Sequence, residues 1–488
     1  MTDRRKENIK RWLTVFHVIG ALLIIESLFM FLSLIPSFIY GGSDAWTITK
    51  CGMITFGCGL LLYLTERTKD IIIDKRQGYI IVALIWVVMS ICGALPYYIG
   101  HYVPSFTDAY YETMSGFTTT GGTIMTNVES IPKGILFWRE LTHWIGGIGI
   151  IVIILSVIPF AGGGGMALFS AEVAGPSKDK ISPKTKQTSK ILLIVYSILT
   201  ILYMLTYWIL GMNFFDAICH AFATVATGGF STKNYSAAAF SPAIQYAMII
   251  FMTLSGTNLL LIYYSYKKKF SKLKQCEEFR VYLGVIIITS LIIFFWTTTP
   301  RSNMEETFRN ALFQVSSILT TTGFVNCDYN QWTAPAIVAL IIIMWSGAMS
   351  GSTTGGLKIV RIILLFKNAK NIITKGIHSN AFIPVKLDNK VVSDDIIYNV
   401  LAVFILYVIV VAVSIIVLVS TNISLEESIV TTLSAITNIG PGFGKSGGFG
   451  NYEYFSDLAK WDLTAIMYIG RLEIMTVFVI FTPSFWKR

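Results

Sequence analysis

Charged residues are scarce in this 488-residue sequence. Asp, Glu, Lys and Arg make up 14% of it, whereas hydrophobic residues make up 54% and the mean hydropathy is +0.64. A string of soluble domains of this length needs more charge to cover its surface. The composition therefore excludes a soluble multidomain protein and predicts an all-α, polytopic membrane protein.

Residue patterns that bind metals or carry out catalysis are also lacking. The cysteines are scattered, without a Cys-x-x-Cys pair or a Cys/His ligand spacing, which indicates free thiols and argues against a metal centre or a disulfide framework. No Ser/His/Asp set stands out, and the Gly-x-Gly at 147–149 follows no strand. We therefore expect neither an enzyme nor a bound nucleotide. The cysteines are Cys51, Cys58, Cys92, Cys219, Cys276 and Cys327.

The net charge of +10 is concentrated in particular segments. Basic loops of membrane proteins stay in the cytoplasm, so these segments and both termini are expected there, and a nucleic-acid surface is disfavoured. The charged N-terminus, with no small-residue cleavage site after the first apolar run, indicates a retained helix rather than a signal peptide. The basic segments are the N-terminal tail, 65–76, 176–190, 267–280, 361–391 and 487–488.

Apolar runs supply the predicted spans, and several are long enough to cross a bilayer alone. The first two form a hairpin joined by a Gly-Gly-Ser turn. The runs lie at 12–40, 47–65, 79–99, 135–160, 190–211, 243–264, 281–297, 335–347, 396–420 and 464–482.

One segment occurs four times without a gap, which indicates an internal repeat. In each copy a polar residue starts a helix-like apolar run, and a glycine follows it 13 residues later. The copies are FTDAYYETMSGFTTTGG ending at Gly122, FFDAICHAFATVATGGF ending at Phe230, FRNALFQVSSILTTTGF ending at Phe324, and LEESIVTTLSAITNIGP ending at Pro441. The starting residues and glycines are Asp108 and Gly121, Asp216 and Gly229, Asn310 and Gly323, and Glu427 and Gly440. In the second copy Gly228 stands beside Gly229, so a slip of one residue is left open.

Each copy is long enough to cross about half of a bilayer's hydrocarbon core. It is therefore predicted to be a half-spanning helix that breaks into extended backbone, and all four copies fall between basic loops and should open away from the cytoplasm. Irregular backbone at membrane depth is tolerated only where protein buries it or where it lines a water-filled path. Glycine lets carbonyl oxygens turn inward and replace the water shell of a monovalent cation, and the helix C-terminal ends also favour a cation. Four copies around one axis thus predict a pore lining.

A later run, GAMSGSTTGGLKIVR at 347–361, interrupts an apolar helix with glycines and small hydroxyl residues. Such a run breaks a helix at membrane depth, either as a packed kink or as a moving gate. A last helix carries Arg471 and Glu473, and ionisable residues inside a span usually face a cavity or a partner. The glycines of the run are Gly347, Gly351, Gly355 and Gly356.

The four loops, the run at 347–361 and IGRLEI at 469–474 together resemble the membrane subunit of the Trk/Ktr/HKT superfamily of potassium transporters, most closely its bacterial TrkH branch. The resemblance covers nearly the whole chain. It implies helix–pore loop–helix repeats around a pseudo-fourfold pore, preceded by a transmembrane hairpin. The implied units are the hairpin at 1–70 and repeats at 71–180, 181–280, 281–392 and 393–488.

The resemblance also implies a function, potassium uptake by channel-like permeation in the bacterial plasma (inner) membrane. K⁺ is the implied transported ion, and carbonyls next to the aligned glycines would form its selectivity filter. Because the four copies differ, selectivity should be loose, with some passage of Rb⁺ and Na⁺. The implied filter residues are Thr119, Thr120, Gly121, Thr227, Gly228, Gly229, Thr321, Thr322, Gly323, Asn438, Ile439 and Gly440.

Control of permeation is likewise implied by the resemblance. The run at 347–356 would gate the path, and Arg471 would point into the pore beneath the filter; a contact of Arg471 with Glu473 or with lipid headgroups is the alternative. A homodimer and a cytoplasmic, nucleotide-binding regulatory subunit are implied partners. The Gly-rich and basic segment at 158–184 would lie near that subunit, unless it is only a solvated loop.

Other interpretations stay open at this point. A symporter that couples the cation to H⁺ or Na⁺ needs a buried acid beside an unwound helix, and Glu473 is the candidate. A non-transporting scaffold is the third possibility. Asp108, Asp216 and Glu427 fit helix N-termini better than a cation-attracting outer mouth. His143 and His220 are interpreted as packed histidines rather than ligands.

Overall fold

Helices make up nearly all of the regular structure that the computed structural model describes, which covers residues 3–65, 74–157, 185–300, 303–378 and 383–487. The described strands are β1 (Lys386–Leu387) and β2 (Lys390–Val391), which pair as a short antiparallel hairpin. The predicted regulatory segment at 158–184 lies outside the described residues. Six described helices are long and apolar enough to cross a membrane, or up to eight if each bent pair counts as one span.

The N-terminal hairpin consists of α1 (Asp3–Leu32), α2 (Leu34–Ile39) and α3 (Ala45–Tyr63). Glycines allow α1 and α3 to pack closely, since a Cβ on Gly59 would lie 2.9 Å from the backbone nitrogen of Ile24. Asp44, at the turn, accepts hydrogen bonds from the Ser37 hydroxyl at 2.5 Å and from the Ile135 backbone N–H at 3.0 Å. The hairpin is therefore fastened to the helix that begins at Lys133.

Four units follow the hairpin, and each has a long helix, a short helix and an inner helix in that order. The long helices are α4 (Lys75–Ile99), α8 (Thr185–Ile209), α13 (Glu277–Thr297) and α17 (Asp394–Ser420). The short helices are α5 (Phe106–Phe117), α9 (Phe214–Ala226), α14 (Met304–Leu319) and α18 (Leu425–Thr437). The inner helices are α6 (Lys133–Val157), α10 (Pro242–Ser255) with α11 (Leu259–Tyr266), α15 (Ala334–Met344) with α16 (Ile359–Ile377), and α19 (Asp457–Arg471) with α20 (Ile474–Ile480). The remaining α-helices are α12 (Phe270–Gln275) and α21 (Pro483–Trp486).

Polar caps begin the short helices at the positions that the sequence indicates, with one exception. Ser105, Asn213 and Ser424 accept hydrogen bonds from the N–H groups of the aligned acids, which places those acids in the first helical turn. In the third unit the helix begins at Met304, capped by Asn303, six residues before Asn310. The prediction that Asn310 starts the helix is therefore wrong, because an earlier Asn supplies the cap.

Three inner helices are broken. The interruption predicted after 344 is present, since α15 ends at Met344 and α16 begins at Ile359. The runs at 243–264 and 464–482, which the sequence predicts as spans, are also interrupted. α10 and α11 meet at a bend of 101°, and α19 and α20 at one of 107°. Asn258 caps the start of α11, and Glu473 has a left-handed backbone (φ 61°) that an α-helix cannot contain.

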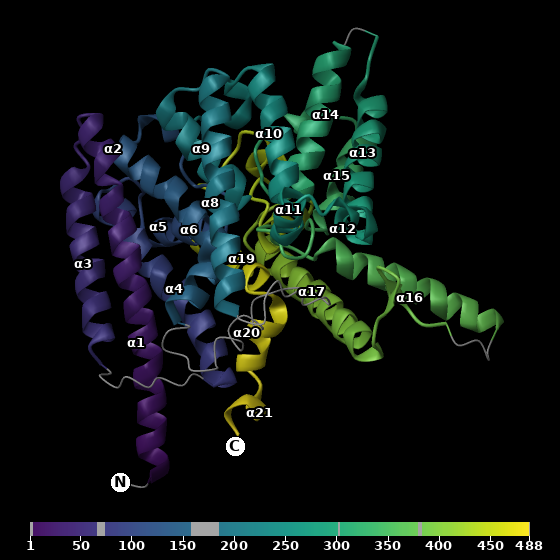
Figure 1. Cartoon of the computed structure of the whole chain (residues 1–488). Coiled ribbons are helices and arrows are strands. Elements are labelled where there is room, and N and C mark those ends of the chain that lie inside the picture. Colours follow the sequence, from purple (N-terminus) through teal and green to yellow (C-terminus); the bar gives the residue numbers. More distant parts are fainter. Residues whose placement is uncertain (1–2, 66–73, 158–184, 301–302, 379–382, 488) are drawn as a thin grey trace.

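The outline of the molecule is uneven (Figure 1). α16 projects sideways from the helical body, and α1 begins on the side of the molecule where α21 ends. The C-terminal residues of the four short helices are buried. The loops that follow those helices form the site described next.

Candidate functional site

The four loops after the short helices meet in a closed ring. A Cβ built on any of the aligned glycines would lie within 3.0 Å of a carbonyl oxygen of the next loop, closer than a real Cβ atom comes. The contacts run from the first loop through the second and third to the fourth, and from there back to the first. From glycine to carbonyl they are Gly121 to Gly228, Gly229 to Thr322, Gly323 to Ile439, and Gly440 to Thr120.

The backbone of the four loops is the same. At the end of each short helix, the residue before the aligned glycine donates its backbone N–H to the carbonyl five residues earlier. The residue directly before this donor has a left-handed backbone, as in a Schellman motif. The bonds are Thr120 N to Ser115 O (2.9 Å), Gly228 N to Ala223 O (2.8 Å), Thr322 N to Ser317 O (2.9 Å) and Ile439 N to Ser434 O (2.9 Å). The left-handed residues are Thr119, Thr227, Thr321 and Asn438, with φ of 52°, 54°, 50° and 59°.

This backbone is costly and is kept in every loop. A β-branched residue with positive φ is a genuine outlier, yet three of the four left-handed positions are threonine. Such strain persists only where the surroundings impose it, and it concentrates at functional sites. The shared conformation, rather than any one side chain, therefore defines the ring.

The alignment of the second loop is now resolved. Gly229 has φ of 76° and contacts the third loop, as its counterparts in the other loops do. Gly228 occupies the position before it, with its Cα against the ring of His143. The ungapped alignment on Gly229 is thus correct, and the slip to Gly228 is excluded.

Glycines of the inner helices bring them against the ring. A Cβ on Gly146 of α6 would come within 3.0 Å of Phe117 O, and one on Gly470 of α19 would do the same to Ile436 O. His143 is fully buried and stacks on Phe230 with ring centroids 4.1 Å apart. It packs between the first and second units, as an interface histidine would, but neither ring nitrogen has a hydrogen-bond partner among the described residues.

Each short helix also supports the segment that leaves the ring, through the residue nine positions before the aligned glycine. Sequence reasoning missed this set, although a polar residue recurring at one position of an apolar helix was a usable signal. A carboxylate, an imidazole, an amide and a hydroxyl each form a hydrogen bond to the segment that follows their own loop. The contacts are Glu112 with Ile124 N (2.9 Å), His220 Nε2 with Ser231 Oγ (2.9 Å), Gln314 Nε2 with Asn326 Oδ1 (3.0 Å) and Thr431 Oγ1 with Ser446 Oγ (3.2 Å).

A buried arginine joins the first two loops. The Arg139 guanidinium donates to Glu112 at 2.7 Å, to Glu140 at 3.3 Å and to the Ser231 carbonyl at 3.2 Å, and its centre lies 3.4 Å from the Phe230 ring centroid. Arg139 and both carboxylates are almost wholly buried. An ion pair in such surroundings is stabilising only while both partners are present. Sequence reasoning also missed this cluster.

On one side of the ring, the segment between α15 and α16 touches three of the four loops. Its Thr353 hydroxyl is 3.4 Å from that of Thr227, and Gly355 N donates to the Thr321 hydroxyl at 3.0 Å. A Cβ on Gly355 would also lie within 3.0 Å of the Asn438 side chain. This interrupted segment, residues 345–358, is called the intramembrane loop below.

Arg471 contacts the same loop. Its guanidinium donates to Thr353 O at 2.7 Å and to Gly146 O at 3.0 Å, so it connects the intramembrane loop to α6 of the first unit. Glu473 forms an ion pair with Arg361 at 2.6 Å.

A cavity of about 330 Å³ lies against three of the four aligned glycines, Gly121, Gly229 and Gly323. Arg139 and Lys233 are among the described residues that line it, and none of those residues is acidic. The acids of the short helices are held within the protein instead: Asp108 pairs with Lys460 at 2.6 Å, Asp216 accepts from the Thr232 hydroxyl at 2.6 Å, and Glu427 accepts from Ser446 N at 3.1 Å. These contacts agree with their interpretation as helix N-terminal residues.

The ring can bind a cation without any charged side chain. Peptide carbonyl oxygens in a narrow ring can replace the hydration water of a monovalent cation. The predicted residues of all four copies are brought together here, as is the intramembrane loop with Arg471. The ring is unequal, since the residues before the glycines are Thr120, Gly228, Thr322 and Ile439.

Comparison with known proteins gives consistent matches along the chain. Residues 45–285 and 279–488 match the TrkH family, described as a cation transport protein. The Trk system potassium uptake protein TrkH of Escherichia coli K12 is 35% identical over 97% of this chain and 99% of that protein. TrkH of Halomonas elongata is 36% identical over the same shares. The crystal structure of the potassium transporter TrkH from Vibrio parahaemolyticus superposes with a TM-score of 0.88 at 30% identity, covering 98% of this chain and all of that one.

The buried Arg139 cluster predicts an asymmetric response to mutation. Arg139→Met leaves Glu112 as an uncompensated buried charge and should cost about 3–5 kcal/mol of stability. Adding Glu112→Gln should restore part of it, because the nearer of the two buried carboxylates then carries no charge, while Glu140 keeps its own. Thermal unfolding of the purified protein in detergent measures both. Equal destabilisation by the single and double variants would contradict a charge-pairing role.

Proposed function

The chain belongs to the TrkH family of cation transport proteins, and on that premise we propose that it is a potassium uptake protein in which K⁺ passes along the axis of the four-loop ring. Neither the family nor its solved relative is an enzyme. We place the chain in the bacterial inner membrane with its basic segments in the cytoplasm. The observation that carries the proposal is the closed ring of loops with one backbone conformation.

We assign the selectivity filter to the three residues that end at each aligned glycine. Their carbonyl oxygens replace water around the ion, and the C-terminal ends of the short helices add partial negative charge. The positive φ of the glycines and the absence of room for a Cβ support this assignment. Four unequal copies should discriminate K⁺ from Rb⁺ and Na⁺ less strictly than four identical ones. The residues are 119–121, 227–229, 321–323 and 438–440.

We assign the gate to the intramembrane loop together with Arg471. The loop contacts Thr227, Thr321 and Asn438, each at the end of a short helix and two residues before an aligned glycine. Arg471 brings a fixed positive charge to the same place, which raises the barrier for a cation. Its hydrogen bond to Thr353 O also holds the loop in position.

The proposal also covers how the chain is divided into units and which partners it binds. The chain is divided into a hairpin at 1–70 and four pore units at 71–180, 181–280, 281–392 and 393–488. The relatives are named as Trk system proteins, which supports a further component. We assign that role to a nucleotide-binding subunit on the cytoplasmic side, and we expect the chain to form homodimers.

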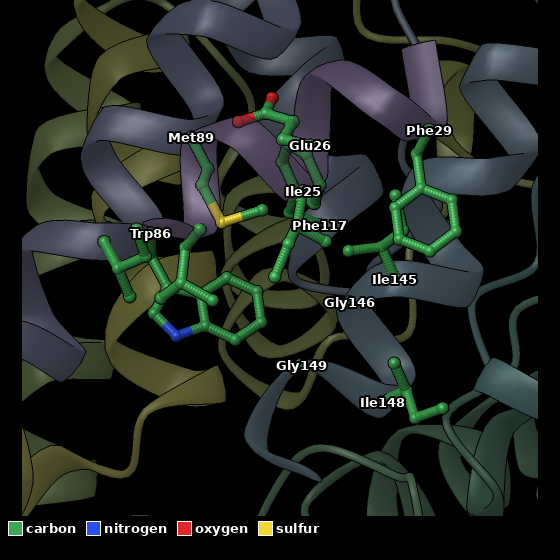
Figure 2. Close-up of a pocket in the computed structure, with 12 residues that line it drawn as sticks. Ile25, Glu26, Phe29, Trp86, Met89, Phe117, Ile145, Gly146, Ile148 and Gly149 are labelled. Carbon is green, nitrogen blue, oxygen red and sulfur yellow. The ribbon is translucent and has the colours of Figure 1, made fainter. Parts of the chain in front are cut away.

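A second candidate function, symport with H⁺ or Na⁺, now rests on Glu26. Its side chain is fully buried, and neither carboxyl oxygen has a hydrogen-bond partner among the described residues. Glu26 lines an apolar cavity of about 30 Å³ with Trp86, Met89 and Phe117 (Figure 2). A buried ionisable group of this kind is a usual site for a coupled proton. Glu473, the candidate acid from the sequence, is instead paired with Arg361.

Replacing the third aligned glycine tests the filter and the function together. The unchanged chain should restore growth of a potassium-uptake-deficient bacterium at low K⁺. Gly323→Ser should abolish that growth or the preference for K⁺ over Na⁺, because its φ of 82° and the adjacent Ile439 carbonyl exclude a side chain. Gly284→Ser is the matched control, since nothing lies within 4 Å of its Cβ position. Unaltered uptake and ion preference in Gly323→Ser would refute the filter assignment.

Removing the intramembrane loop tests the gate. Deletion of residues 347–356 should raise cation flux into proteoliposomes, since an obstruction is removed from beneath the ring. Correct insertion is checked by monodisperse elution and by binding of the protein to liposomes. Flux equal to that of the full chain would place the gate elsewhere.

Neutralising Arg471 tests its electrostatic role. Arg471→Gln should increase single-channel conductance or tracer uptake, because the barrier to a cation falls when the charge is removed. Arg361→Gln, which alters the neighbouring pair with Glu473, serves as the comparison. Lower flux in Arg471→Gln at equal expression would count against a pore position for this residue.

A further inference from the structure

The first turn of α13 carries two adjacent carboxylates that serve different neighbours. Glu278 is 6% exposed and faces the intramembrane loop. One of its carboxyl oxygens accepts from Ser350 N at 2.7 Å and the other from the Ser350 hydroxyl at 2.9 Å. The backbone N–H and the hydroxyl of Ser350 thus both donate to the one buried carboxylate.

The same part of the loop is also fixed by backbone bonds. Met349 N donates to Gly256 O, and Leu259 N donates to Gly351 O, both at 3.1 Å. These bonds attach residues 349–351 to the break between α10 and α11. Glu278 holds the middle residue of the three, so residues 349–351 are held between the second unit and α13.

Glu277, the neighbouring residue, binds elements outside the loop. Its carboxylate forms an ion pair with Lys367 of α16 at 2.6 Å, and its backbone N–H donates to Asp388 at 2.7 Å. Lys367 also donates to the Lys386 carbonyl at 2.7 Å. The turn that holds the loop is therefore bonded to α16 and to the hairpin of β1 and β2.

We propose that Glu278 is a latch that holds the intramembrane loop in its closed position, and that Glu277 couples this latch to α16 and the β1–β2 hairpin. The proposal rests on the assignment of the loop as the gate. A hydrogen bond to a charged acceptor is strong in a buried site, so loss of the two bonds to Ser350 favours release of the loop. A displacement of the hairpin or of α16 pulls on Glu277 and shifts Glu278 with it.

Glu278 is a positioning residue in this scheme, because it acts on the ion through the loop. A purely structural role would give a different pattern: its replacement would lower stability and flux together. The latch predicts higher flux at unchanged or slightly lower stability. It also predicts that Glu278 has no influence once the loop is absent.

Tracer K⁺ or Rb⁺ uptake into proteoliposomes that contain the full chain tests the latch. Glu278→Gln should raise uptake roughly tenfold, since a charge-assisted hydrogen bond is lost from the closed state alone. Ser350→Ala, which removes only the hydroxyl partner, should give a smaller increase, and the two changes together should give no more than Glu278→Gln alone. Asp462→Asn is the control, because this carboxylate bonds Ser414, outside the loop.

The background without residues 347–356 separates the latch from the proposed gate. No cation uptake by either the full or the deleted chain would refute the proposed function itself. If deletion raises uptake and Glu278→Gln does not, the latch is refuted while the gate stands. An equal increase from Glu278→Gln in the deleted background would also refute the latch, because the residue would then act elsewhere. If Glu278→Gln does not fold, Ser350→Ala decides alone: an increase supports the latch and no change refutes it.

The link to the hairpin is tested by Lys367→Met. This change should raise uptake in the otherwise unchanged chain and have no effect in the Glu278→Gln background, because both act on one element. No increase in the unchanged chain, or an equal increase in both backgrounds, would refute the coupling through Glu277. A latch without coupling would then remain, as a local restraint on the loop.

Discussion

The close approach of four peptide loops is the constraint on which the structure depends. Each aligned glycine lies where the next loop's carbonyl group leaves no space for a Cβ atom. A single chain closes this ring because its four short helices end in the same way, with a left-handed residue followed by a bond back to the helix. Backbone without regular structure survives in a membrane only when protein surrounds it or water fills it. The long helices, the inner helices and the N-terminal hairpin supply those surroundings.

The four loops have the same backbone conformation, but the side chains that support them differ. The position nine residues before each glycine is Glu, His, Gln or Thr, and every one of them holds the segment that leaves its own loop. Only the glutamate requires a buried arginine, and Arg139 extends this support to the second loop. The four loops therefore share one backbone geometry although their supporting side chains differ in chemistry. A ring of this kind is not bound to strict fourfold symmetry.

The side of the ring that contacts the intramembrane loop is built from broken helices. The breaks after α10, α15 and α19 expose backbone groups that a continuous helix would satisfy internally. Gly256 O and Leu259 N, at the first break, bond the intramembrane loop, which is itself the second. Arg471, at the end of α19, bonds the loop from the third. The backbone groups at one break are thus satisfied by residues at the others, while Ala348, Met349 and Leu357 of the loop pack into the apolar cores.

Local features of the chain were determined by the sequence alone. The half-length helices, the glycine at a constant spacing and the Gly-rich interruption follow from turn chemistry and polarity, which act over a few residues, and the family resemblance followed from the same motifs. Long-range contacts decided the rest. They selected Gly229 over Gly228, paired Glu473 with Arg361, and left the Glu26 carboxylate buried between helices. The bends at 256–258 and 472–473 and the Glu278 contact with Ser350 also depend on neighbours far along the chain, whose positions no local pattern contains.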